Sequence, residues 1–138
     1  MKFKYNDGGR AAAGFSGKAS DCVVRAIAIA SGKSYREIFD AINYLADNEC
    51  FDGSDAEHGV HKKLERDYLK SLGWIWTPTM GIGTGCKVHL KDGELPMGNL
   101  IVQVSKHLVA VIDGVINDTH DCSRNGTRCV YGYFTKPQ

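Results

Sequence analysis

One histidine and one aspartate stand where a hairpin would bring them together. Apolar runs flank Asp113-Gly114, and Asp-Gly between apolar runs predicts a two-residue turn. That register places Asp118 opposite Val109, and because side chains alternate with a period of two, His107 and Asp118 share a face as diagonal neighbours. A histidine beside a carboxylate on a stiff sheet suits the base and the orienting group of a nucleophilic site. The same pair also occurs in sheets without any chemistry.

A base and an orienting group need a nucleophile, and Cys22 is the best placed of the thiols. A predicted helix begins at Ser20, a good N-cap, and ends at Gly32, a natural C′ residue. Cys22 therefore lies in the first turn, where unpaired backbone N–H groups and the helix dipole favour the thiolate. Asp21 opposes this negative charge, whereas Arg25 is spaced to form an ion pair with Asp21. The helix is apolar almost all round, which predicts that it is buried.

The remaining cysteines have less favourable surroundings for a reactive thiol. Cys50 stands between acidic residues, which disfavour a thiolate, and the others adjoin predicted loops: Cys86, Cys122 and Cys129. Five cysteines at irregular spacing argue against a fully paired disulfide framework and are typical of a reducing compartment. The N-terminus has no apolar signal core, and no run reaches the roughly 18 apolar residues of a membrane span. We therefore expect a cytoplasmic protein.

Length and composition limit the class of protein. A chain of 138 residues suits one domain, and its 43% hydrophobic and 24% charged residues are typical of a soluble globular protein. The formal net charge of +1 gives no electrostatic reason to expect nucleic acid or a membrane surface as a partner.

The expected elements place helices first and strands second. We expect an irregular arm at residues 1–19. A capping box at Ser34–Glu37 predicts the start of a second helix that continues to about Ala46. A third helix is expected at about residues 57–72. Strands are expected at residues 74–77, 100–104, 107–112, 115–119 and 128–134. This is an α+β layout, with N-terminal helices that include a buried central helix packed on a C-terminal antiparallel β-meander.

These stretches resemble the papain-like class of cysteine hydrolases. That class places its cysteine at the N-terminus of a buried central helix, its histidine early on a later strand, and Asp or Asn on the next strand. Cys22, His107 and Asp118 follow the same order. The stretches D-C-V-V-R-A-I-A-I-A and H-L-V-A-V-I-D-G-V-I-N-D-T are similar to small phage and bacterial proteins of this type. The resemblance implies a single papain-like domain over residues 1–138.

The resemblance also implies a thiol hydrolase that acts on an amide or acyl group of a peptide or protein substrate, with no cofactor and no metal. Cys22 would attack the carbonyl, His107 would hold the proton, and Asp118 would fix the tautomer of the ring. Papain-like peptidases usually carry a Gln about six residues before the cysteine as an oxyanion donor, but Ser16 stands there in this chain. Ser16, Asn6 or a backbone donor such as the N–H of Cys22 would replace it. Acyl transfer by the same residues, the substrate and the oligomeric state stay open.

A zinc site is one alternative. His120, Cys122 and Cys129 are clustered, and His58 and His61 share a face of the third expected helix. The two cysteines lack the close paired spacing that is typical of structural zinc sites, so this alternative is the weaker one.

A second alternative is a catalytically weak or inactive papain-like fold that serves as a protein-binding module. Its contact residues would be the aromatic side chains at strand spacing, Trp74, Trp76, Tyr131 and Tyr133. Aromatic residues at such spacing are also typical of a core.

Overall fold

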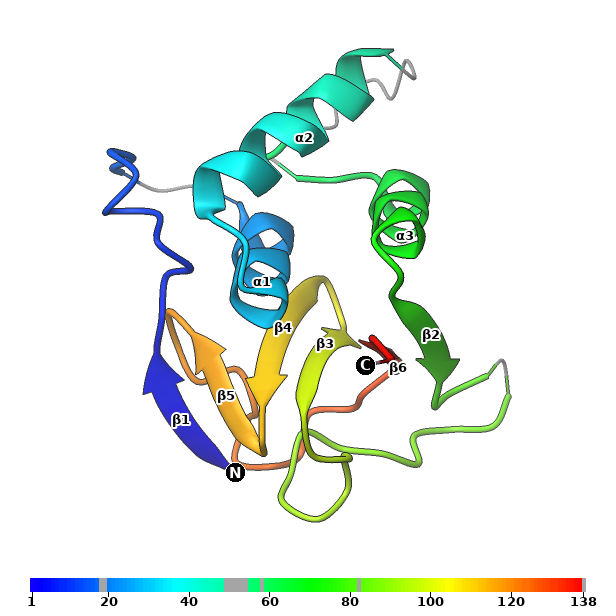
Figure 1. Cartoon of the computed structure of the whole chain (residues 1–138). Coiled ribbons are helices and arrows are strands. Elements are labelled where there is room, and N and C mark those ends of the chain that lie inside the picture. Colours follow the sequence, from blue (N-terminus) through cyan, green and yellow to red (C-terminus); the bar gives the residue numbers. More distant parts are fainter. Residues whose placement is uncertain (18–19, 49–54, 58, 82, 138) are drawn as a thin grey trace.

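The computed structural model describes residues 1–17, 20–48, 55–57, 59–81 and 83–137. Within them the chain forms an α+β fold in which helices pack on a mixed, mostly antiparallel six-stranded sheet of order β1-β5-β4-β3-β6-β2 (Figure 1). The helices are α1 (Cys22–Ser31), α2 (Tyr35–Asn48) and α3 (Lys62–Ser71). The strands are β1 (Lys2–Tyr5), β2 (Ile75–Pro78), β3 (Asn99–Val104), β4 (His107–Ile112), β5 (Val115–Asp118) and β6 (Gly132–Thr135).

The expected hairpin is confirmed as β4 and β5. Asp113 and Gly114 both have positive φ, 48° and 78°, as the primed two-residue turn requires. Ile112 pairs with Val115, so the register is the predicted one. β5 ends at Asp118, one residue earlier than expected.

The central helix α1 is buried, as its apolar sequence predicts. Val24 and Ile27 are fully buried, and α1 packs mainly on β4, with α2 on its other side (Figure 1). Gly32 caps it in the left-handed conformation and donates its N–H to the Ala28 carbonyl. The predicted N-cap at Ser20 is wrong: the helix begins at Cys22, and the cap position falls on Asp21, whose side chain is held by other partners.

The N-terminal arm is not irregular throughout. Lys2–Tyr5 forms strand β1, which pairs in parallel with β5 from Lys2↔Val115 to Tyr5↔Asp118. All four residues of β1 are exposed, so the strand has no buried face and its sequence carries little signal. The sheet is therefore not the simple C-terminal antiparallel meander that we expected, because β1 adds a parallel edge and β2, which pairs with β6, adds the other edge.

The two flanking helices have boundaries that differ from the predicted ones. The Ser34 hydroxyl accepts the Glu37 N–H at 3.1 Å, as the capping box predicts, and α2 continues to Asn48. The third helix starts later than expected, because His61 caps α3 by accepting the Lys63 N–H on its ring. The last strand, β6, is shorter at its start than predicted and runs one residue further.

The sheet has an apolar cluster on each face. One joins the helices to the sheet through residues such as Ile101, Leu108 and Ala110. The other lies on the opposite face under the loops and includes Val109, Val111, Ile116 and Cys122. The site residues at the ends of β4 and β5 lie where these two layers meet.

Two of the cysteines are joined. Cys86 and Cys129 form a disulfide, which corrects their treatment as separate thiols, whereas Cys22 and Cys122 are free. Cys50 lies outside the described residues. In the part of the chain that the structure describes, every helix is too short or too polar to cross a bilayer. The compartment stays a prediction.

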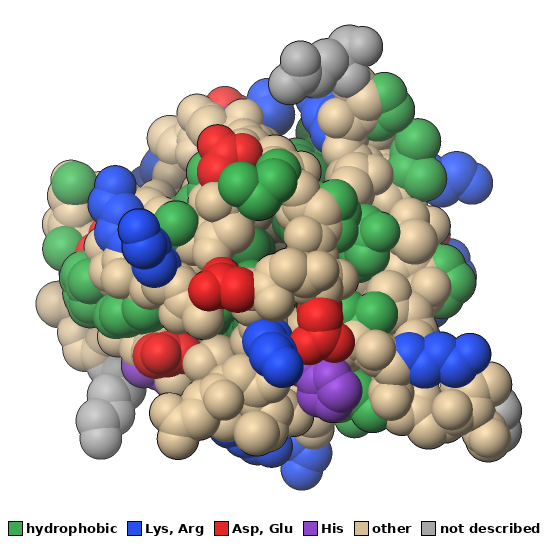
Figure 2. All heavy atoms as spheres, turned by 90° about the horizontal axis from the view of Figure 1, so that it is seen from below, with side chains coloured by type: hydrophobic (Ala, Val, Ile, Leu, Met, Phe, Trp, Pro, Cys, Tyr) green, Lys and Arg blue, Asp and Glu red, His purple; other side chains and the backbone are tan. Residues whose placement is uncertain are grey.

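Charged side chains of both signs are interspersed on the face seen from below (Figure 2). This distribution agrees with the net charge of +1, because neither sign dominates that face. That nucleic acid and membranes are not partners stays a prediction.

Gly132, the first residue of β6, generates a stability prediction. A Cβ at this position would overlap the Trp76 ring and the Thr77 carbonyl oxygen. We expect Gly132→Ala to lower the free energy of unfolding by about 1–3 kcal/mol, since the tryptophan must shift to admit the methyl group. Urea denaturation measures it. Gly81→Ala, where the new Cβ would meet only ordinary contacts, is the control, and equal stability of both variants would contradict the packing seen here.

Candidate functional site

The His107 and Asp118 side chains meet at the open end of the hairpin. His107 Nε2 lies 2.6 Å from Asp118 Oδ2, and the two side chains are 12% and 4% exposed. Thr119 donates its N–H to the other oxygen, Oδ1, at 2.7 Å. The predicted diagonal contact is therefore present. With Nε2 engaged by the carboxylate, Nδ1 is the ring nitrogen left for another partner.

Cys22 comes close to the same ring from the start of α1. Its thiol, which is partly exposed, interacts with the His107 ring, and both residues line one cleft of about 230 Å³. The structure therefore brings together all three residues that the sequence singled out. The thiol comes from a helix N-terminus, the imidazole from the first residue of a strand, and the carboxylate from the last residue of the neighbouring strand.

The ring of His107 is held in its protonated form. Burial lowers the pKa of His107, but hydrogen bonds with Asp118, Cys122 and Cys22 outweigh that effect and raise the pKa to about 11. Burial raises the pKa of Asp118, whereas the hydrogen bond and the charge of His107, the Thr119 N–H and Arg25 lower it, and the net direction is downward. Each partner therefore stabilises the charged form of the other.

Arg25 connects this pair to the start of α1. Its guanidinium lies 2.7 Å from Asp21 Oδ1 and 3.4 Å from Asp118 Oδ1, with the side chain 12% exposed. The predicted Asp21–Arg25 ion pair is thus confirmed, and Arg25 also bridges to the hairpin. Because Arg25 offsets the charge of Asp21, the aspartate that precedes Cys22 does not stand as a lone negative charge beside the thiol.

The far side of Asp21 carries two partners that the sequence analysis missed. The Tyr35 hydroxyl donates to Asp21 Oδ2 at 2.6 Å, and Arg10 donates to the same hydroxyl at 3.0 Å. Burial and the hydrogen bond to Asp21 raise the pKa of Tyr35 to about 12, so this hydroxyl keeps its proton. Both residues come from segments far from Cys22 in sequence, and no local pattern points to them.

Cys122 is a second thiol beside the same ring. It is 3% exposed and belongs to the apolar cluster on the opposite face from α1. By strand alternation His107 and Asp118 belong to that same face, which explains why Cys122 is close to them. It lines none of the clefts around Cys22. The structure therefore distinguishes an accessible thiol from a buried one.

His107, Asp118 and Cys122 are the described residues whose spacing fits a metal, with ligand atoms within 4.8 Å of one another. Two ligands of a tetrahedral zinc ion stand roughly 3.3 Å apart, since each bond is about 2.0–2.1 Å long. The 2.6 Å contact between His107 and Asp118 is too short for both atoms to flank such an ion, and it is a hydrogen bond. These residues as arranged fit a proton-sharing pair better than a zinc site.

Among the described residues, the histidines and cysteines considered from the sequence as zinc ligands do not form one cluster. Cys129 is bonded to Cys86, and His61 caps α3 with its ring. His120 stacks near His107 at 5.4 Å between ring centroids, while His58 lies outside the described residues.

The two side chains suggested from the sequence as oxyanion donors, Asn6 and Ser16, lie away from the Cys22 cleft. The Asn6 side chain donates to Asn117 and accepts the Gly8 N–H. Ser16 lines a separate hollow of about 710 Å³ on the other side of Asp21. Ser20 lines both this hollow and the Cys22 cleft, so it is the hydroxyl residue that shares the cleft with the thiol.

Gln103 is a further cleft residue that the sequence analysis passed over. Its side chain is buried and donates to the carbonyls of Val104 and His107, at 2.6 and 3.1 Å. It therefore fixes the backbone that carries the imidazole. Its donors are already used by those two carbonyls.

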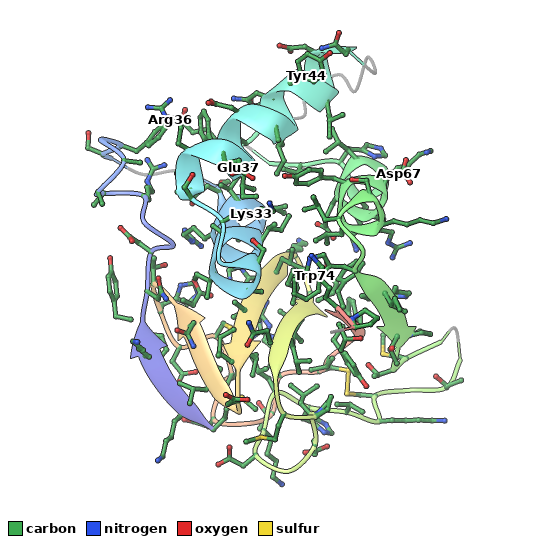
Figure 3. All side chains as sticks on the ribbon, in the orientation of Figure 1. Lys33, Arg36, Glu37, Tyr44, Asp67 and Trp74 are labelled. Carbon is green, nitrogen blue, oxygen red and sulfur yellow. A yellow bond between two sulfur atoms is a disulfide. The ribbon has the colours of Figure 1, made fainter. Side chains whose placement is uncertain are left out.

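The aromatic residues considered as protein contacts are largely in the interior. Trp74 is 4% exposed and lies between α3 and β3 (Figure 3), and the Trp76 ring packs at a tilt against Phe134, with 4.8 Å between centroids. Tyr133 packs against the cluster on the opposite sheet face. These positions favour a core role over a contact surface.

Comparison with protein families, curated proteins and solved structures finds no match to this chain. The class of protein is therefore described from its fold and its candidate site alone. It is an α+β domain with a helix-start cysteine beside a histidine–aspartate pair.

The opposed pKa shifts of His107 and Asp118 generate a pH prediction. The contribution of His107 to stability is fully present below about pH 6.5, its unfolded pKa, and is lost as the pH rises toward about 11. The contribution of Asp118 is present above about pH 3.8 and is lost as the pH falls below it. We expect His107→Gln to cost about 1–3 kcal/mol more at pH 5.5 than at pH 9 in urea denaturation. His89→Gln, at a more exposed histidine that pairs with Glu94 away from the site, is the control. A cost for His107→Gln that does not change with pH would show that folding does not raise the pKa of the ring, which would contradict the charged pair with Asp118.

Proposed function

We propose that the chain is a papain-like cysteine hydrolase that acts on an amide or acyl group of a peptide or protein substrate. The observation that carries this proposal is the His107 ring, which is hydrogen-bonded to Asp118 and lines one open cleft together with Cys22. A protonated imidazole and a helix N-terminus both stabilise a thiolate, which is the nucleophilic form of cysteine.

The reaction follows from these positions. The Cys22 sulfur bonds to the carbonyl carbon, and the carbonyl oxygen becomes an oxyanion that accepts the N–H of Cys22, in the first turn of α1. The carbon–nitrogen bond then breaks, and the leaving amine takes a proton from His107. Water attacks the thioester, gives its proton to His107 and releases the acid with Cys22 as the thiolate. Asp118 keeps Nε2 occupied throughout, so Nδ1 exchanges the proton.

The surroundings of Cys22 support an extended substrate. The cleft on one side and the hollow of about 710 Å³ on the other share Ser20, two residues before the thiol. A peptide that lies across Ser20 would have room on both sides of the scissile bond. An amine that enters in place of water would turn the same steps into acyl transfer.

Selective alkylation tests the activated thiol. We expect iodoacetamide to modify Cys22 below pH 7, because the helix start and His107 hold it as a thiolate, while Cys122 and Cys50 stay unmodified. Peptide mapping by mass spectrometry measures each site. His107→Ala should slow the reaction of Cys22 at least about tenfold at that pH.

Cys122 is the matched comparison, since it adjoins the same ring but is buried. Equal labelling of Cys22 and Cys50, or an unchanged alkylation rate of Cys22 in His107→Ala, would show that Cys22 is not an activated thiol. The binding-module alternative would then be favoured.

Replacement of the carboxylate separates an orienting role from a structural one. We expect Asp118→Asn to fold but to lower the alkylation rate of Cys22 near pH 6 at least about tenfold, because an amide does not stabilise the protonated ring. Circular dichroism and the alkylation rate are measured together. Asp121→Asn, an exposed aspartate three positions later in the chain, is the control. Global unfolding of Asp118→Asn would assign Asp118 a structural role instead.

A further inference from the structure

Glu65 is a carboxyl group inside the cleft that the proposed reaction does not use. It lies on the inner face of α3 beside Leu64, Tyr68 and Leu69, and it is 4% exposed. The cleft that it lines is the one that also contains Cys22 and His107. A buried acid and a candidate nucleophile therefore face the same space.

Among the described residues, no side chain forms an ion pair or hydrogen bond with the Glu65 carboxyl. The charges of Lys62 and Arg66 act on it only at longer range, and the Arg66 guanidinium lies over the Trp76 ring, 5.4 Å from its centroid. Burial raises the pKa of Glu65 to about 7. A buried carboxylate without a partner costs free energy, so one that faces a cleft is typical of a group that meets its partner in a ligand.

The rest of the cleft wall agrees with a cationic partner. Val23, Val60 and Leu108 supply apolar surface for the methylene stem of a long side chain. Gln103, the buried amide in the same wall, already donates to two carbonyls, so it offers no free N–H to an anionic group. Glu65 is then the buried acid of the wall, with both oxygens available to a ligand, and an ionised carboxylate only accepts.

We infer that Glu65 is a specificity residue that binds a positively charged group of the substrate, an ammonium or a guanidinium, within the Cys22 cleft. This inference rests on the proposed function, because it assigns a substrate class to the same site. The cation would supply the missing ion pair, while the scissile carbonyl lies at the sulfur.

Lys62 and Lys106 also line the cleft, and both are exposed. Their charges disfavour a cation near the entrance, so the attraction must come from the buried carboxylate at short range, where the local dielectric is lower. The ionisation state of Glu65 should therefore decide how the cleft ranks charged against neutral ligands.

Two thiol reagents of the same shape test this ranking without a known substrate. The probes are 2-(trimethylammonio)ethyl methanethiosulfonate, whose positive charge is permanent, and 3,3-dimethylbutyl methanethiosulfonate, its uncharged analogue. In each case the Cys22 thiolate attacks the sulfenyl sulfur, a mixed disulfide forms, and methanesulfinate leaves with the electron pair. The readout is the ratio of the two rate constants at Cys22, followed by peptide mapping.

At about pH 8 we expect Glu65→Gln to lower the ratio of cationic to neutral rate about three- to tenfold. Asp67→Asn removes the same charge from the outer side of α3, where Asp67 points away from the sheet and pairs with Lys63 (Figure 3), and should leave the ratio unchanged. An equal drop in both variants would reduce the effect to net charge and overturn the inference.

The wild-type protein gives a second measurement that needs no variant. As Glu65 ionises, the ratio should rise several-fold between pH 6 and 8, and this step should be absent in Glu65→Gln. The other cations around the cleft, Lys62, Lys106 and Arg66, are the same in the wild type and in Glu65→Gln, so they do not produce a difference between the two. The pKa of His107 is raised to about 11 and that of Asp118 is lowered, so both groups stay charged in that range. Ionisation of Cys22 changes both rates equally and cancels.

The outcomes separate this inference from the proposed function. If both reagents modify Cys22 slowly and His107→Ala changes neither rate, the proposal that Cys22 is an activated nucleophile is wrong. If Cys22 is activated but the ratio is flat with pH in the wild type and unchanged in Glu65→Gln, only the cationic specificity is wrong.

Discussion

Arg25 is a half-buried cation placed between two buried carboxylates, and the geometry of the site depends on it. Removing charges from water costs several kcal/mol per ion, so the two buried carboxylates need this guanidinium as their partner. Asp21 belongs to the start of α1 and Asp118 to the end of β5. The two contacts therefore fix where the helix begins relative to the end of the hairpin. Cys22 follows Asp21 and His107 is held by Asp118, so the same contacts bring sulfur and imidazole together.

This constraint also explains why the site lies at an end of the sheet. His107 and Asp118 point by alternation to the face that α1 does not cover, and only at a strand end can a side chain of that face meet the helix start. The buried Gln103 holds the His107 carbonyl, and Asp118 holds the ring, so the imidazole is fixed at both its backbone and its side chain. Such support reduces the motion that would separate base from nucleophile.

The sequence predicted those parts of the site that depend on residues close together in the chain. Asp113-Gly114 specifies a turn with positive φ at both positions, and this turn alone sets the register that joins His107 to Asp118. The partners that hold Asp21 from behind, Arg10 and Tyr35, come together only through tertiary packing. No periodicity in the sequence signals such contacts.

Other features were missed for reasons that can be named. β1 has no buried side chain, and its pairing rests on backbone groups, so hydrophobic patterning cannot reveal it. The disulfide joins cysteines that are separated by 43 positions, and spacing does not give connectivity. Glu65 had a weak signal: its neighbour Leu64 and the later Tyr68 and Leu69 widen the apolar face of α3 until it includes the acid.

One imidazole beside two thiols raises the question of which sulfur reacts. Both interact with the ring and so favour its charged form, but only Cys22 has the N–H groups of a helix start and access to a cleft. Cys122 is surrounded by apolar side chains such as Val109 and Ile116, and low polarity disfavours a thiolate. Access to the cleft therefore makes Cys22 the sulfur that the proposed reaction uses, while Cys122 belongs to the buried cluster on the opposite face of the sheet.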